Sequence, residues 1–107
     1  MIKITKCASK KIIEKMRKEN LLGYGLRVAI VGGGINGFEY TLSFSDHPAE
    51  SDITFESNGV KIFVDPNSYL YLQNVTIDFV EKDSQAGFVF HNPKPISLIE
   101  KEVKEVN

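Results

Sequence analysis

The sequence predicts a single β-rich domain of the α+β class. One amphipathic helical pattern opens the chain, and a series of short apolar runs separated by turn residues follows it, which is typical of strands. A chain of 107 residues, 42% of them apolar and 25% charged, is long enough for one hydrophobic core and too short for two. We therefore expect one domain in which helical and extended segments occupy separate parts of the chain.

The N-terminal helix is expected to begin at Thr5, whose hydroxyl suits the N-cap position. Ala8, Ile12 and Met16 recur at helical spacing, and charged residues stand between them. Asn20 tolerates the left-handed conformation that closes helix ends. The pattern therefore predicts an amphipathic helix that ends near this residue.

Short strands are predicted downstream, and apolar and polar residues alternate most clearly over residues 38–44. Asn58 and Gly59 stand between two apolar runs, which is a strong hairpin signal. Asp65 followed by Pro66 predicts the cap and the first position of a helix of one or two turns. Strands are expected at residues 26–31, 38–44, 53–55, 60–64, 75–80 and 88–90.

The end of the chain has a different pattern. Ser97 and Glu100 are spaced as a capping box, and Ile99, Val103 and Val106 fall on one helical face. These features predict a terminal amphipathic helix.

The competing interpretation is a short strand at residues 96–99 followed by a charged tail, because a helix this short is marginal without packing. In both interpretations we expect residues 1–95 to form the domain and residues 96–107 to form an amphipathic C-terminal tail.

The charge balance argues against a nucleic-acid partner. The formal net charge is −1, with 13 Lys and Arg against 14 Asp and Glu, whereas nucleic-acid binding requires a basic surplus to neutralise phosphates. No run approaches the roughly 20 consecutive apolar residues of a membrane span, and no apolar secretory core follows Met1. The single cysteine, Cys7, cannot form an intramolecular disulfide or hold a metal alone. We expect no nucleic-acid partner, no membrane association and a cytoplasmic location.

Residues along most of the chain match a known family in order and spacing. In chain order they are Ile4-Thr5, Gly25-Leu26-Arg27-Val28, Gly32-Gly33-Gly34, Gly37-Phe38, Tyr40, Phe55-Glu56, Gly59-Val60, Val64-Asp65-Pro66, Ser68, Leu72, Ile77-Asp78-Phe79-Val80, Gly87-Phe88-Val89-Phe90 and Asn92-Pro93. Any one of these fragments would be weak evidence, but the ordered set is specific. On the basis of this ordered set, the chain resembles the A-type iron–sulfur carriers of the HesB/IscA-like family over roughly residues 2–93.

The resemblance implies a compact, HesB-like β-sandwich or barrel with the helix on one side, assembled into dimers or tetramers. It also implies a non-enzymatic role in carrying iron or an iron–sulfur cluster to recipient proteins. In typical members three cysteines bind this cargo. One lies between the glycine run and the following glycine, and two form a Cys-x-Cys shortly after the Asn-Pro pair.

This chain departs from the family pattern at all three cysteine positions. Ile35 occupies the first, its neighbour is Asn36, and no cysteine follows Pro93. Thiolates hold cluster iron because anionic sulfur donates strongly and compensates the charge of the cluster. Isoleucine has no donor atom, and a neutral amide oxygen is a poor substitute. We expect no cofactor bound autonomously, and iron or a cluster only if it is shared with a partner or held by non-cysteine ligands.

Four glycines, Gly32, Gly33, Gly34 and Gly37, surround Ile35. Glycine-rich turns can direct backbone N–H groups at a phosphate, but this run lacks the following Lys-Ser/Thr and leads into a strand instead of a helix. We expect the glycines to form the tight inter-strand turn that, in the family, presents the first cysteine.

Two other side chains are weak metal-ligand candidates. A Tyr40 phenolate would be a hard oxygen ligand for ferric iron, although tyrosines in alternating strands more often pack and form hydrogen bonds. His91, at the end of the last predicted strand, could supply an imidazole nitrogen, but the sequence specifies no second ligand beside it. Mononuclear iron or zinc binding through Tyr40, His91 and nearby carboxylates is the least favoured hypothesis.

The leading hypothesis is a non-enzymatic, carrier-like protein of iron–sulfur cluster assembly that acts as the partner of a cysteine-bearing paralogue. Homo- or hetero-oligomers with family members, and contacts to assembly or recipient proteins, are the expected partnerships. The alternative is a protein-interaction or small-ligand module on the same fold with no metal role, because function resides in sites and not in folds.

Overall fold

The computed structural model describes residues 1–34 and 37–93 of the chain. Seven strands and two helices occur in these residues. In chain order they are β1 (Lys3–Ile4), α1 (Lys6–Lys18), β2 (Gly25–Gly34), β3 (Gly37–Ser45), β4 (Ile53–Ser57), β5 (Val60–Val64), α2 (Pro66–Leu72), β6 (Thr76–Lys82) and β7 (Gln85–His91).

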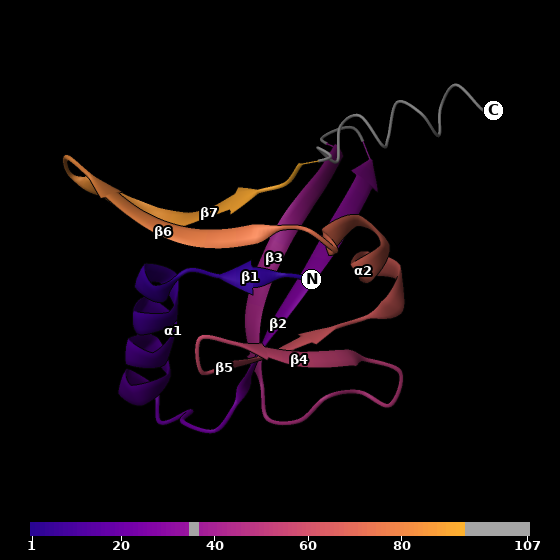
Figure 1. Cartoon of the computed structure of the whole chain (residues 1–107), viewed down its shortest axis with the longest axis horizontal. Coiled ribbons are helices and arrows are strands. Elements are labelled where there is room, and N and C mark those ends of the chain that lie inside the picture. The colour runs from indigo at the N-terminus through magenta and orange to yellow at the C-terminus, as the bar shows by residue number, and fades with distance from the viewer. Residues whose placement is uncertain (35–36, 94–107) are drawn as a thin grey trace.

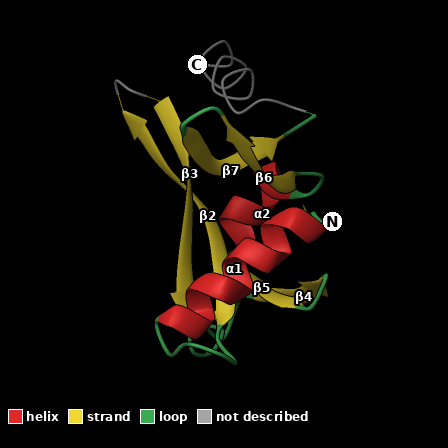
Figure 2. Cartoon of the chain, turned by 90° about the vertical axis from the view of Figure 1, so that its left-hand side faces the viewer, coloured by secondary structure: helices red, strands yellow, loops and turns green. Residues whose placement is uncertain are grey.

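The strands form two sheets (Figure 1). The four-stranded sheet has the order β3-β2-β5-β4, and the three-stranded sheet has the order β1-β6-β7. Three antiparallel hairpins, β2–β3, β4–β5 and β6–β7, are joined by the parallel pairs β1–β6 and β2–β5. Helix α1 packs against β6 and β5, and it crosses the side of the molecule that faces the viewer in Figure 2. The predicted β-rich α+β class is confirmed.

The hydrophobic core lies between the two sheets and α1. It takes side chains from nearly every element, among them the almost fully buried Ile4, Ile12, Val28, Ile62 and Ile77. Burying one such side chain contributes roughly 1.5–3 kcal/mol. The apolar positions that share one helix face or one strand face therefore hold the sheets and the helix together.

Helix α1 forms as its sequence predicts. The Thr5 hydroxyl accepts a hydrogen bond from the Ala8 backbone N–H at 3.1 Å, which caps the helix. Ala8, Ile12 and Met16 are buried, so the predicted apolar face is the face that packs on the core. The helix ends two residues before Asn20, whose φ of 59° is left-handed.

The two predicted local turns are also present. Asn58 and Gly59 have φ values of 48° and 81°, the left-handed conformations that a tight hairpin requires, and they connect β4 to β5. At the start of α2, the Asp65 carboxylate accepts hydrogen bonds from the N–H and the hydroxyl of Ser68 at 2.9 and 2.7 Å. Pro66 is the first residue of that helix, as expected.

Two features differ from the sequence expectation. Lys3 and Ile4 form strand β1, which pairs in parallel with Thr76 and Ile77. Two residues are too few to show a strand period, so the sequence did not predict β1. The long hairpin also reaches further than expected, because β2 continues through Gly34 and β3 begins at Gly37.

An ion pair fixes the loop between β3 and β4. Arg27 Nη2 lies 2.7 Å from Asp52 Oδ2, and the same oxygen accepts a hydrogen bond from the Ala49 N–H at 2.7 Å. The Asp52 side chain is 2% exposed, and the Arg27 side chain is 27% exposed. The Arg27 hydrogen bond, with smaller help from Ala49, outweighs burial and lowers the pKa of Asp52.

The predicted C-terminal helix, the competing strand at residues 96–99 and the predicted tail at residues 96–107 lie outside the described residues, and all three stay predictions. Within residues 1–34 and 37–93, no helix is both long and apolar enough to cross a bilayer.

Candidate functional site at the tip of the long hairpin

The glycine run lies at the far end of the β2–β3 hairpin. Gly32 pairs with Phe38 and Gly34 pairs with Gly37, and the register shifts between the two pairs. Gly32 has a φ of 110°, and a Cβ added there would collide with the carbonyl oxygen of Gly37. Gly32 is therefore required by backbone conformation and by the close approach of the opposite strand. Ile35 and Asn36, which join the strands, lie outside the described residues.

Below the tip, an aromatic pair joins the two sheets. The rings of Tyr40 on β3 and Phe90 on β7 are stacked, with centroids 4.3 Å apart and planes 5° from parallel. Phe38 and Tyr71 form a second stacked pair, with centroids 6.3 Å apart. Aromatic pairs of this kind contribute about 0.5–1.5 kcal/mol beyond the area that they bury. The hairpin is thereby held against β7 and α2.

Asn92 ties the end of β7 to the same region. Its Nδ2 donates hydrogen bonds to the Tyr40 hydroxyl at 3.2 Å and to the Tyr71 carbonyl at 3.1 Å. One side-chain amide therefore connects the chain after β7 to β3 and to α2. In the sequence, Asn92 stands out only as part of a family motif, because a contact between residues so distant in the chain leaves no local signal.

The structure places the two weak metal-ligand candidates, Tyr40 and His91, apart from each other. Phe90 faces Tyr40, and successive residues of a strand point to opposite faces, so His91 lies on the other face of β7. On that outer face His91 is near Asp78. A hydrogen bond from the Thr5 hydroxyl at 2.7 Å lowers the pKa of Asp78, with smaller contributions from the Phe79 N–H and from the charge of His91. Tyr40 and His91 do not converge on one metal position.

The cysteine does not lie at the hairpin tip. Cys7 is exposed in the first turn of α1, and its thiol lies 3.4 Å from the carbonyl oxygen of Phe79 on β6. Within residues 1–34 and 37–93, no group of three or more His, Cys, Asp or Glu side chains is arranged to hold a metal ion. A cluster held by thiolates does not fit the donor atoms of the described chain.

The fold is that of a protein involved in the biosynthesis of iron–sulfur clusters. The chain belongs to the iron–sulphur cluster biosynthesis family, because the family model with that description matches residues 1–96. The resemblance found in the sequence is confirmed. Members of this family are carriers and not enzymes, so the expectation of a non-enzymatic protein is also confirmed.

Individual relatives agree with this assignment. The chain is 45% identical over 89 residues to the iron–sulfur cluster insertion protein ErpA of Ruthia magnifica subsp. Calyptogena magnifica, covering 80% of this chain and 74% of that protein. It is similar to Escherichia coli SufA, which is described as involved in biosynthesis of iron–sulfur clusters, with a TM-score of 0.73 and 30% identity. That match covers 88% of this chain and 87% of the SufA chain. A protein from Aquifex aeolicus matches with a TM-score of 0.67 and 35% identity over 86% of this chain and 91% of its own.

Proposed function

We propose that this chain is a carrier-like protein of iron–sulfur cluster biosynthesis that cannot ligate a cluster through the thiolates its family uses, and that it works as the partner of a cysteine-bearing relative. The observation that carries the proposal is the position of its one cysteine. Cys7 lies in the first turn of α1, whereas Ile35 occupies the hairpin position at which the family presents a thiolate.

The chemistry of the missing ligands supports this limit. A cluster carries net negative charge with its thiolates and needs several sulfur donors at once, so one exposed cysteine cannot replace a convergent set. Without thiolates, several oxygen and nitrogen donors would have to converge on one position to hold the iron. Tyr40 and His91 lie on opposite sides of β7, and the Tyr40 hydroxyl is already hydrogen-bonded to Asn92.

The described residues around the hairpin tip nevertheless form an ordered set of contacts. Gly32 keeps the conformation that only glycine adopts easily, and Tyr40, Phe90 and Asn92 hold the base of the tip against the second sheet. A hairpin of this form without a cysteine at position 35 is suited to a shared site, in which a relative supplies the thiolates and this chain supplies surface and shape. Iron or a cluster would then be cargo of the pair. A cytoplasmic location, and contacts to assembly or recipient proteins, are parts of the same proposal.

Co-purification tests the partnership. This chain, carrying an affinity tag, would be expressed anaerobically together with a cysteine-bearing relative such as an ErpA-type protein. We expect the relative to be recovered with it and the complex to contain iron and sulfide. The matched control is the same relative with its cysteines replaced by serine, which should still co-purify but without iron. Failure to recover the relative under any growth condition would contradict the partnership and favour an interaction or small-ligand module with no metal role.

A further inference from the structure

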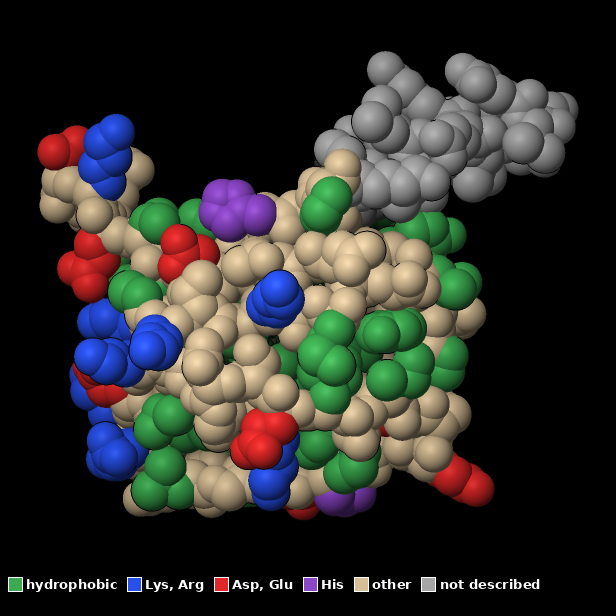
Figure 3. Space-filling view, in the orientation of Figure 1, with side chains coloured by type: hydrophobic (Ala, Val, Ile, Leu, Met, Phe, Trp, Pro, Cys, Tyr) green, Lys and Arg blue, Asp and Glu red, His purple; other side chains and the backbone are tan. Residues whose placement is uncertain are grey.

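Helix α1 concentrates positive charge in a chain that is slightly acidic overall. Its thirteen residues include six Lys or Arg and one Glu, whereas the whole chain has a formal net charge of −1. Figure 3 shows Lys and Arg side chains gathered at the left edge of the molecule, over this helix. The apolar face of α1 is buried in the core, so the helix cannot insert that face into a membrane. Its exposed charge is suited to an acidic partner.

A groove runs beside this helix. One cavity of about 330 Å³ lies between α1, β3 and β7, and a second of about 280 Å³ lies between α1 and the β6–β7 hairpin. Lys15 and Phe88 line both cavities, and we call the two together the α1 groove. The first cavity has an apolar lining that includes Ile12, Leu26 and Leu42. It is large enough to accept an aliphatic or aromatic side chain.

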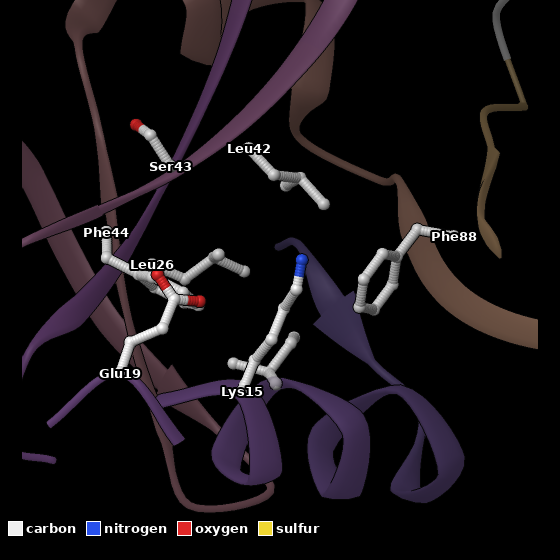
Figure 4. A pocket seen from close by; sticks show the side chains of 8 residues that line it. Lys15, Glu19, Leu26, Leu42, Ser43, Phe44 and Phe88 are labelled. Carbon is white, nitrogen blue, oxygen red and sulfur yellow. The ribbon is translucent and has the colours of Figure 1, made fainter. Parts of the chain in front are cut away.

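Lys15 is the cation placed to meet a ligand in this groove. Its ammonium projects into the first cavity between Leu42 and Phe88 (Figure 4). Two other lysines of the groove already have carboxylate partners. Lys11 lies 3.6 Å from Glu81, and Lys18 lies 3.8 Å from Glu14.

Lys15 forms no salt bridge with any described residue. Among the described residues that line the first cavity, Glu19 has the one carboxylate, and it lies near Leu26 and Phe44 at the other side of the opening (Figure 4). A carboxylate entering beside Lys15 would gain an ion pair without breaking one.

Two strand edges border the same groove. Within the described residues, β3 pairs only with β2, and β7 pairs only with β6. Near the hairpin tip, the Tyr40–Phe90 pair brings the two strand edges together. Further from the tip, Leu42 on β3 and Phe88 on β7 line the first cavity. Unpaired strand edges offer backbone N–H and C=O groups to an added extended segment.

We infer that the α1 groove binds an extended, acidic segment of a partner protein, with one large apolar side chain in the first cavity and a carboxylate on Lys15. Free edges of β3 or β7 would receive the backbone of that segment. The groove lies beyond the Tyr40–Phe90 pair from the hairpin tip, so this binding is separate from the proposed sharing of a cluster. A recipient protein could dock in the α1 groove whether this chain or its cysteine-bearing partner holds the cluster.

A synthetic peptide of about ten residues, with a central Leu-Phe flanked by glutamates, is the probe. Titrated into the ¹⁵N-labelled full chain, it should shift the amide signals of Lys15, Leu42, Ser43 and Phe88. The same peptide with glutamine in place of glutamate should bind more weakly, and so should one with alanine in place of Leu-Phe. An absence of shifts up to millimolar peptide, or equal binding of the glutamine peptide, would overturn the inference.

Charge variants locate the binding. An ion pair near 4 Å in water is worth about 1 kcal/mol, so Lys15→Gln should weaken binding about fivefold. Lys10→Gln is the matched control, because Lys10 is also exposed on α1 but lines neither cavity. Equal weakening by both variants would mean a diffuse charge effect and would overturn the assigned site.

A second pair of variants carries its substitutions outside α1. Leu42 projects into the first cavity (Figure 4), so Leu42→Ala should weaken binding of the peptide by removing part of the apolar lining. Leu22→Ala, at an exposed leucine that lines neither cavity, should leave the affinity unchanged. Unfolding curves of all four variants would show that the effects are on binding. Binding of the chain to phosphatidylglycerol vesicles without binding of the peptide would also refute the inference, because it would assign the charge of α1 to a lipid surface.

Discussion

The ion pair between Arg27 and Asp52 allows a quantitative prediction about stability. Asp52 is almost completely buried, and one of its oxygens accepts both the Arg27 and the Ala49 hydrogen bonds. Breaking a buried pair by removing one partner typically costs 3–5 kcal/mol, because the remaining charge is left uncompensated. The Arg27 side chain is 27% exposed, so water can reach the site. We therefore expect Arg27→Met to cost about 2–3 kcal/mol at neutral pH.

Asp52→Asn is the matched comparison. The amide oxygen of asparagine can accept the same two hydrogen bonds, so the variant removes the charge and keeps the shape. We expect a smaller loss of about 1–2 kcal/mol. Urea unfolding followed by circular dichroism would give both free energies, with the m-value as a check that the unfolded state is unchanged.

The stability of the two variants should also depend on pH in different ways. The folded-state pKa of Asp52 lies below its ordinary value of 3.8, so the stability from its ionised form is present above that value and is lost as the pH falls through the folded-state pKa. Asp52→Asn should lose less stability on acidification than the unmodified chain. In Arg27→Met, burial acts on Asp52 without its main opposing contact, so the pKa of Asp52 should rise and the defect should shrink at acid pH. Equal losses of stability in both variants at every pH would show that the charge of Asp52 does not contribute to the stability of the fold.

Three further predictions concern the hairpin tip and the first helix. Gly32→Ala should destabilise the chain by about 1–3 kcal/mol in urea, because it combines a positive φ with a collision against the opposite strand, whereas Gly87→Ala, with open space around it, should change stability by less than about 0.5 kcal/mol. Asn92→Ala should cost about 1–2 kcal/mol, and Tyr40→Phe, which removes only the accepting hydroxyl, should cost less; the opposite order would contradict the described hydrogen bonds. Thr5→Val should cost about 1–2 kcal/mol in thermal unfolding, since it removes the cap of α1, and an unchanged Tm would argue against that cap.

Local signals in the sequence predicted much of the fold. Thr5 and Asp65 cap the helices at the expected positions, and Asn58 with Gly59 forms the expected hairpin turn, because each depends on conformations and hydrogen bonds within a few residues. Strand β1 was not predicted, since it exists only through pairing with β6 at the other end of the chain.

The candidate site was predictable in part. The glycines and the absence of cysteine at Ile35 can be identified directly in the sequence. The bonds from Asn92 and the opposite orientations of Tyr40 and His91 depend on how β3 and β7 meet in space. No spacing within the chain encodes such contacts, and the α1 groove is hidden for the same reason, because three elements distant in sequence enclose it.

We expect that this chain alone does not hold an iron–sulfur cluster by thiolates. The decisive measurement is anaerobic reconstitution of the purified chain with iron and sulfide, followed by visible absorption and iron analysis after desalting. No stable chromophore should form on the unmodified chain, and none on Ile35→Cys, which still lacks cysteines after Pro93. A stable cluster absorption band with stoichiometric iron in the unmodified chain would show that the chain binds a cluster by itself.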